Sequence, residues 1–206
     1  MKKTDLIILG LMALGAIWAL FLPNVKPHIR YLDNHEILYK INTKERYLSV
    51  DDVAKIIMTK NPGYILVDVR KPEAYKQFTL PGSINIPLDS LFTDNNRKLL
   101  EQDVYKLVFF SNGTSLADRA WLLSTAAGYT GLYVMKGGLN AWFNDLLMPK
   151  RPSDIAPPQE FDLYNFRRGA AAFFTGASAG EEASPAKATV NITVPVKKKE
   201  VGGGCE

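Results

Sequence analysis

A single stretch of the chain, residues 105–138, constrains the fold most. Tyr105–Phe110 is a largely apolar run that predicts a buried strand, and a polar loop with one glycine, Ser111–Ser115, follows it. The helical pattern of Leu116–Ala127 comes next, so the segment forms a strand–loop–helix unit. In α/β sheets such a loop lies at the carboxyl end of its strand, where backbone N–H groups at the helix start can bind an anion.

Strands and helices alternate through the rest of this region. The predicted strands are Tyr47–Leu48, Tyr64–Val69, Ile84–Ile86 and Leu132–Met135. Two helices are predicted to begin at Ser49 and at Pro72. A further helical stretch is predicted from Leu88 to Leu100 with a loop at Asp94–Asn96, and the last helix is predicted around Asn140–Trp142. This alternation predicts a doubly wound α/β domain with a parallel sheet and helices on both faces. Asp68 lies in a buried strand, so we expect it to hold loop backbone or to pair with Arg70.

The first 23 residues predict a membrane anchor. A basic start is followed by an unbroken apolar run, residues 6–22, and Pro23 ends it. As a helix this run would span roughly 25 Å, the short end for a bilayer crossing. A cleaved signal peptide is the alternative, although the run is long for one and no small-residue cleavage site follows. We expect the N-terminus in the cytoplasm and the body of the protein outside it, in the periplasm or an equivalent compartment.

Composition limits the remaining chemistry. The net charge of +4 is spread along the chain, which argues against nucleic-acid binding. Cys205 is the single cysteine, so no intramolecular disulfide can form. The two histidines, His28 and His35, have no Cys or carboxylate cluster beside them. We therefore expect neither a metal nor a cofactor.

Several motifs follow one another along this region: Leu66–Arg70, Leu80–Pro87, Leu107–Phe110, Ala120–Leu123, Gly128–Tyr129 and Tyr133–Gly138 with Ala141–Trp142. Taken together and in this order, they resemble a rhodanese (sulfurtransferase) domain. The resemblance implies a rhodanese-like domain at residues 46–148. It also implies structural roles for Asp68, Arg70, Pro81, Gly82, Gly137, Gly138 and Trp142.

The resemblance also implies a catalytic Cys at the end of the central strand, and here that position falls on Phe110 or, in the alternative register, on Ser111. The family's loop Arg falls on Ser115. A persulfide requires a thiolate, and Ser111 would need a general base. The body of the protein has no His, and Asp118, one turn further on, could be proposed as that base. We therefore expect no catalysis at this position. The loop residues Ser111, Asn112, Gly113, Thr114 and Ser115 would retain anion binding without turnover.

The flanking segments complete the predicted organisation. Residues 24–45 form a polar connector, residues 149–174 a Pro-rich linker with an aromatic and basic helix at Glu160–Phe174, and residues 175–206 a disordered tail ending in Gly-Gly-Gly-Cys-Glu. The helix could pack back on the domain, bind a partner or lie on a membrane.

Two functions follow from these observations. The first is a catalytically degenerate rhodanese-like binding module, anchored in a membrane through residues 6–22 and serving as a subunit of a larger membrane complex with protein partners. The alternative is a sulfur carrier or sulfurtransferase that uses Cys205 on its glycine tether. The expected small ligand is an anion or a sulfur species.

Overall fold

The computed structural model describes residues 31–176, together with residues 4, 5, 12 and 14. The chain divides into two compact units, Met1–Tyr31 and Leu32–Glu206, and the fold given below is that of the second. The predicted anchor at residues 6–22 lies outside the described residues except for Met12 and Leu14, and residues 177–206 of the predicted tail lie outside them entirely. None of the helices within the described part of the chain combines the length and apolar character needed to cross a membrane.

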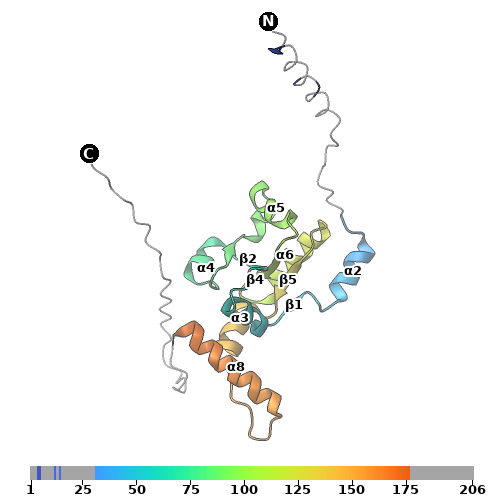
Figure 1. Cartoon of the computed structure of the whole chain (residues 1–206). Helices are drawn as coiled ribbons and strands as arrows, with labels where there is room; N and C mark the ends of the chain where they lie inside the picture. Colours follow the sequence, from blue (N-terminus) through green and yellow to red (C-terminus); the bar gives the residue numbers. More distant parts are fainter. Residues whose placement is uncertain (1–3, 6–11, 13, 15–30, 177–206) are drawn as a thin grey trace, which may run out of the picture. The chain divides into compact units, whose positions relative to one another are not determined.

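A five-stranded parallel sheet with the order β1-β5-β4-β2-β3 forms the centre of the fold (Figure 1). The strands are β1 (Tyr47–Leu48), β2 (Tyr64–Asp68), β3 (Ile84–Asn85), β4 (Lys106–Phe110) and β5 (Leu132–Met135). Leu107 of β4 pairs with Ile65 of β2 and with Leu132 of β5. The predicted parallel sheet is confirmed, and its middle strand is the one that leads into the polar loop.

The helices alternate with these strands. They are α2 (Asn34–Asn42), α3 (Val50–Met58), α4 (Pro72–Gln77), η1 (Leu88–Ser90), α5 (Asp94–Glu101), α6 (Thr114–Ala126), α7 (Gly138–Ala141), η2 (Trp142–Leu147) and α8 (Pro158–Thr175). The expectation of a loop at Asp94–Asn96 is wrong, because these residues begin α5. Thr93 precedes them with extended backbone, and an acidic residue in the first turn suits the helix dipole.

Local sequence signals explain where two of these helices begin and end. Ser49 caps α3: its side chain accepts from the N–H of Asp52, whose carboxylate accepts from the N–H of Ser49. Pro158 occupies the first turn of α8, and Gly176, with a φ of 69°, ends it. The predicted helix start at Ser49 is confirmed, and the predicted helix Glu160–Phe174 lies within two residues of the observed bounds of α8.

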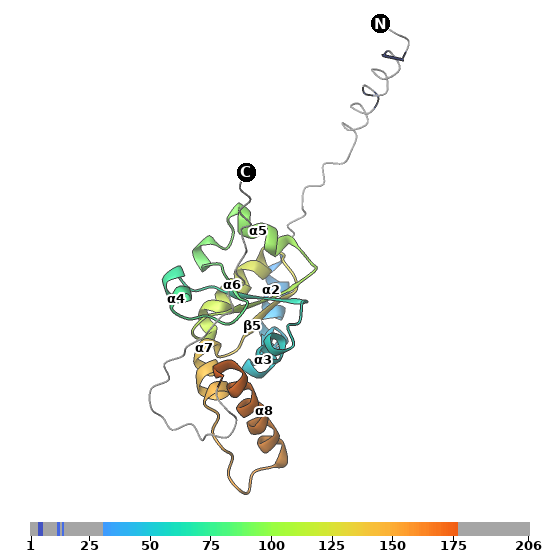
Figure 2. The same ribbon diagram turned by 60° about the vertical axis from the view of Figure 1, so that its left-hand side comes forward.

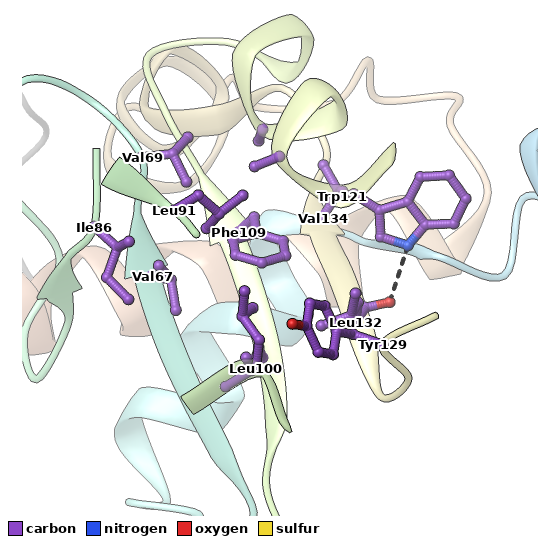
Figure 3. Packing of buried hydrophobic residues seen from close by; sticks show 13 residues of the cluster. Val67, Val69, Ile86, Leu91, Leu100, Phe109, Trp121, Tyr129, Leu132 and Val134 are labelled. Atoms are coloured by element: carbon purple, nitrogen blue, oxygen red, sulfur yellow. Dashed lines mark hydrogen bonds between the residues drawn. The ribbon is translucent and has the colours of Figure 1, made fainter. Parts of the chain in front are cut away.

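Both faces of the sheet are covered. Side chains alternate along β4, so that Leu107 and Phe109 face one layer while Val108 and Phe110 face the other. Figure 3 shows the first layer, where Trp121 of α6 packs over the sheet and donates from Nε1 to the carbonyl of Leu132 at 3.2 Å. The second layer includes residues of α3, η2 and α8. Helices on both faces are thus confirmed.

Helix α8 packs on the second layer, next to η2 and on the same side as α3 (Figure 2). Ala170 is buried, and the ring of Phe174 meets the ring of Trp142 edge-on with centroids 4.9 Å apart. Arg167 donates to both carboxylate oxygens of Asp51, at 2.8 and 2.7 Å. Of the three alternatives for this helix, packing on the domain is the one observed.

Candidate functional site

A pocket of about 320 Å³ lies where β4 ends and α6 begins. Its lining includes four of the five predicted loop residues, Ser111, Asn112, Gly113 and Ser115, joined by Arg70, Leu116 and Arg119. The fifth, Thr114, does not line it. The structure therefore brings together most of the loop that the sequence marked as an anion site, and it adds two guanidinium groups.

The orientation of the loop backbone leaves its donors available. The carbonyls of Ser111 and Asn112 accept from the N–H groups of Leu139 and Asn140, both at 2.8 Å. Within the described part of the chain, the N–H groups of Asn112 and Gly113 donate to no protein acceptor. The first-turn N–H groups of α6 also lack partners inside their helix. These donors and the positive end of the helix dipole favour a negatively charged ligand.

Two consecutive glycines allow this arrangement. Gly138 has a φ of 57°, and a Cβ atom on it would overlap the backbone of Ser111 and Asn112. Gly137, with a φ of 80°, donates from its N–H to Oγ1 of Thr114 at 2.8 Å. Thr114 thus fastens the start of α6 to the turn before α7. Both glycines therefore lie in the turn that packs against the loop, and Gly138 leaves no room for a side chain.

A buried ion pair holds the other wall of the pocket. Asp68 is fully buried at the end of β2, and its oxygens accept from Nε of Arg70 at 3.0 and 3.1 Å and from Nη2 at 2.6 Å. Thr79 donates a further hydrogen bond to the same carboxylate at 3.0 Å. The expected pairing of Asp68 with Arg70 is confirmed. Nη1 of Arg70 then reaches Oδ1 of Asn112 at 2.9 Å, so the pair also fixes the loop.

Arg119 is the functional candidate that sequence reasoning missed. It is exposed, it lines the pocket, and within residues 31–176 it forms no ion pair. The resemblance places the family's loop Arg at Ser115, which carries no charge, so no loop cation was expected. Arg119 lies four residues later on α6, so it shares a helix face with Ser115. The four-residue spacing between Ser115 and Arg119 is the sequence signal that could have identified Arg119.

The two proposed nucleophile positions have different surroundings. The side chain of Phe110 is fully buried in the second core layer and does not line the pocket. Ser111 does line the pocket, and its hydroxyl donates to the carbonyl of Gly113 at 2.6 Å. Cys205 lies outside the described residues. Neither loop position carries a thiol.

Asp118, considered as a general base for Ser111, is engaged elsewhere. Its carboxylate accepts from Nε of Arg46 at 3.2 Å and from the hydroxyl of Tyr47 at 2.9 Å. These two hydrogen bonds direct the carboxylate of Asp118 to Arg46 and Tyr47, which argues against its role as the base of Ser111. No group of three or more His, Cys, Asp and Glu side chains suited to a metal occurs in the described part of the chain. His35 lies on α2, and His28 is outside that part.

Comparison with known proteins gives a family match for the central part of the chain. Residues 49–145 match the family model of the rhodanese-like domain. This match and the parallel α/β fold support a rhodanese-like domain in that part of the chain. The matched residues are a little under half of the sequence.

The chain is also similar to individual proteins. The thiosulfate:glutathione sulfurtransferase of Saccharomyces cerevisiae is 28% identical over 104 residues, which are 46% of this chain and 75% of the relative. A probable molybdopterin-synthase adenylyltransferase of Pyropia yezoensis is 34% identical over 106 residues, or 51% of this chain, but the match spans only 27% of its length. A crystal structure of a Bacillus halodurans protein aligns with a TM-score of 0.46 at 24% identity, covering 55% of this chain and 82% of that one.

Proposed function

We propose that the rhodanese-like domain binds a small sulfur-containing oxyanion in the loop pocket and forms no persulfide there. The observation that carries this proposal is the guanidinium of Arg119, which has no ion-pair partner among the described residues and lies beside unused N–H donors. The loop between β4 and α6 contains no Cys, so the thiolate needed for sulfur transfer has no place in it. Binding without covalent chemistry is the function these groups support.

The choice of a sulfur oxyanion rests on the relatives. Thiosulfate is named as a substrate of the yeast relative, and the pocket volume of about 320 Å³ accommodates an anion of that size. Charge-assisted hydrogen bonds from Arg119 and from backbone N–H groups would satisfy the oxygens of such a ligand. Leu116 supplies the apolar part of the lining.

Titration calorimetry of the full chain with thiosulfate and with sulfate tests this proposal. We expect Arg119→Gln to weaken binding about tenfold, because a charged hydrogen bond contributes about 1.5 kcal/mol. Lys98→Gln on α5 removes the same charge from an exposed site outside the pocket and should leave the affinity nearly unchanged. Equal losses in both variants would indicate a general charge effect, and no binding by the unchanged protein would refute the proposal.

The names of the relatives also favour the alternative, sulfur transfer through the tail. In that scheme the thiolate of Cys205 attacks the outer sulfur of thiosulfate, a new S–S bond forms, and sulfite leaves with the electrons of the broken bond. Mass spectrometry after incubation with thiosulfate would show one added sulfur atom on the tail peptide. The adduct must be absent from Cys205→Ser. If the unchanged protein gains no sulfur, the carrier function is excluded for this donor.

We further propose that residues 1–23 anchor the protein in a membrane with the domain on the extracytoplasmic side, where it serves as a subunit of a larger complex. The support is the apolar run at residues 6–22 behind a basic start. Flotation of the full chain with phospholipid vesicles after alkaline carbonate treatment tests the anchor. Co-purification of stoichiometric proteins in mild detergent tests the complex; a protein that is always recovered alone would contradict it.

A further inference from the structure

We infer that the outward side of α2 lies against the lipid headgroups of the membrane. This inference rests on the proposed anchor, but it concerns a separate surface of the molecule. A membrane contact at α2 would set how the domain, and with it the pocket, is presented to soluble ligands. The candidate surface consists of Leu38, Tyr39 and Ile41 on α2.

These side chains are unusually exposed for their size. The exposed fraction is 58% for Leu38, 73% for Tyr39 and 37% for Ile41. Within α2 itself the structure fully buries no residue. A helix with three exposed apolar or aromatic side chains has a surface suited to contact with another apolar environment.

The helix is nonetheless fixed to the domain by its ends. Before α2, the N–H of Leu32 donates to the carbonyl of Ala126 at the end of α6, at 3.2 Å. After it, Nη1 of Arg46 donates to the carbonyls of Ile41 at 2.6 Å and Thr43 at 2.9 Å. The exposed side chains are therefore held on the outer side of a docked helix.

Arg46, which holds the C-terminal end of α2, is itself fixed by contacts to α6. Its Nε pairs with Asp118 of α6 at 3.2 Å, and its guanidinium carbon lies 4.6 Å from the centre of the Trp121 ring. The C-terminal end of α2 is thus joined to the same helix that forms the pocket. Through these contacts of Arg46, the position of α2 is coupled to that of α6.

The position of α2 in the chain argues for lipid as the occupant. Only residues 23–33 separate the apolar run from α2, a tether of at most about 40 Å when fully extended. α2 is also the first described helix after that run. Tyrosine is enriched at the membrane–water interface, because its ring is apolar and its hydroxyl is polar, and Tyr39 fits that preference.

Fluorescence of site-specific labels in the full chain tests the inference. Because Cys205 is the only cysteine, Cys205→Ser provides a background for single labels at Leu38→Cys and, as a control, at Ile155→Cys, which is 94% exposed in the segment before α8. Each protein is reconstituted in vesicles of phosphatidylcholine and phosphatidylglycerol, with or without a nitroxide lipid labelled near the headgroup. We expect nitroxide lipid to reduce the fluorescence at position 38 and not at position 155.

The outcomes separate this inference from the proposed anchor. If the protein floats with the vesicles but the label at position 38 is not quenched, the anchor stands and the α2 surface is refuted. A blue-shifted label that nitroxide lipid does not quench would show a protein occupant, either a second copy or another subunit, and would also refute it. If the protein does not float with the vesicles, both the proposed anchor and the inferred α2 contact are refuted. Thermal unfolding of the two labelled proteins must match that of Cys205→Ser, since both positions are exposed.

Discussion

Arg70 donates from Nη1 to Oδ1 of Asn112 at 2.9 Å, while its Nε and Nη2 are held by the buried carboxylate of Asp68. One guanidinium thus connects the end of β2 to the loop after β4. The loop is consequently held by the sheet on one side and by α7 on the other. A preorganised loop loses little entropy when a ligand binds, so its donors can act together.

Arg70→Leu should lower the free energy of unfolding by about 3–5 kcal/mol, because it leaves the carboxylate of Asp68 buried without its cation. Urea denaturation of the full chain measures this loss. Combining Arg70→Leu with Asp68→Asn should restore part of the stability, since the uncompensated charge is then removed. Lys71→Leu, at an exposed neighbouring position, should change stability by no more than about 0.5 kcal/mol. A small loss in Arg70→Leu would mean that Asp68 finds another partner.

Gly138→Ala should disorganise the pocket. The added Cβ would overlap the backbone of Ser111 and Asn112, and the residue has a positive φ that L side chains rarely adopt. We expect a stability loss of at least about 2 kcal/mol together with loss of anion binding. Thermal unfolding and calorimetry with thiosulfate measure the two effects.

The matched control is Gly169→Ala in the middle of α8, where a Cβ would meet nothing within 4 Å. This change should stabilise the protein by about 0.5–1 kcal/mol, because Ala has the higher helix propensity. Unchanged anion binding in Gly138→Ala would show that the loop does not depend on its contact with α7.

The pair formed by Arg167 and Asp51 should contribute measurably to the attachment of α8. Both side chains are mostly buried, and hydrogen bonding to Asp51 raises the pKa of Arg167 above its ordinary value. A double-mutant cycle with Arg167→Met and Asp51→Asn should give a coupling of about 1–2 kcal/mol. The same cycle on the largely exposed pair of Arg151 and Asp154 should give a coupling of at most about 0.5 kcal/mol. Equal couplings would show that burial does not distinguish the two pairs.

Much of the fold could be predicted from local patterns. The apolar run in β4 and the one in β2 are continuous because both strands are buried on both faces, and that signal is strong. Ser49 likewise marked the start of α3, which it caps. Helix α2 was missed because its sequence is neither clearly polar nor clearly apolar on average and none of its residues is fully buried, so it was interpreted as part of a polar connector.

The candidate site was less predictable, for a different reason. Its loop residues are contiguous and could be listed from the sequence, but Arg119 belongs to it through helix geometry and Arg70 through the packing of β2 beside β4. Likewise, nothing in the sequence showed that Asp118 would be held by Arg46 and Tyr47. Such three-dimensional pairings depend on which segments the topology brings together.

Introduced cysteines can decide which loop position faces the pocket. In a Cys205→Ser background, we expect Ser111→Cys to be alkylated rapidly near neutral pH and to gain sulfur from thiosulfate. Its thiol would lie at the start of α6 beside Arg119, and both the helix N-terminus and a cation lower the pKa of a thiol. Phe110→Cys should be unreactive in the folded protein, because that side chain is fully buried among apolar residues. Phe110→Cys should also cost about 3 kcal/mol of stability through the cavity it leaves.

Alkylation rates of both variants are measured from pH 5 to 9 by mass spectrometry, with alkylation in denaturant as the control for access to the thiol. If Phe110→Cys is the variant that takes up sulfur, then the chain has kept the family's geometry at Phe110 and the pocket proposed around Ser111 is wrong.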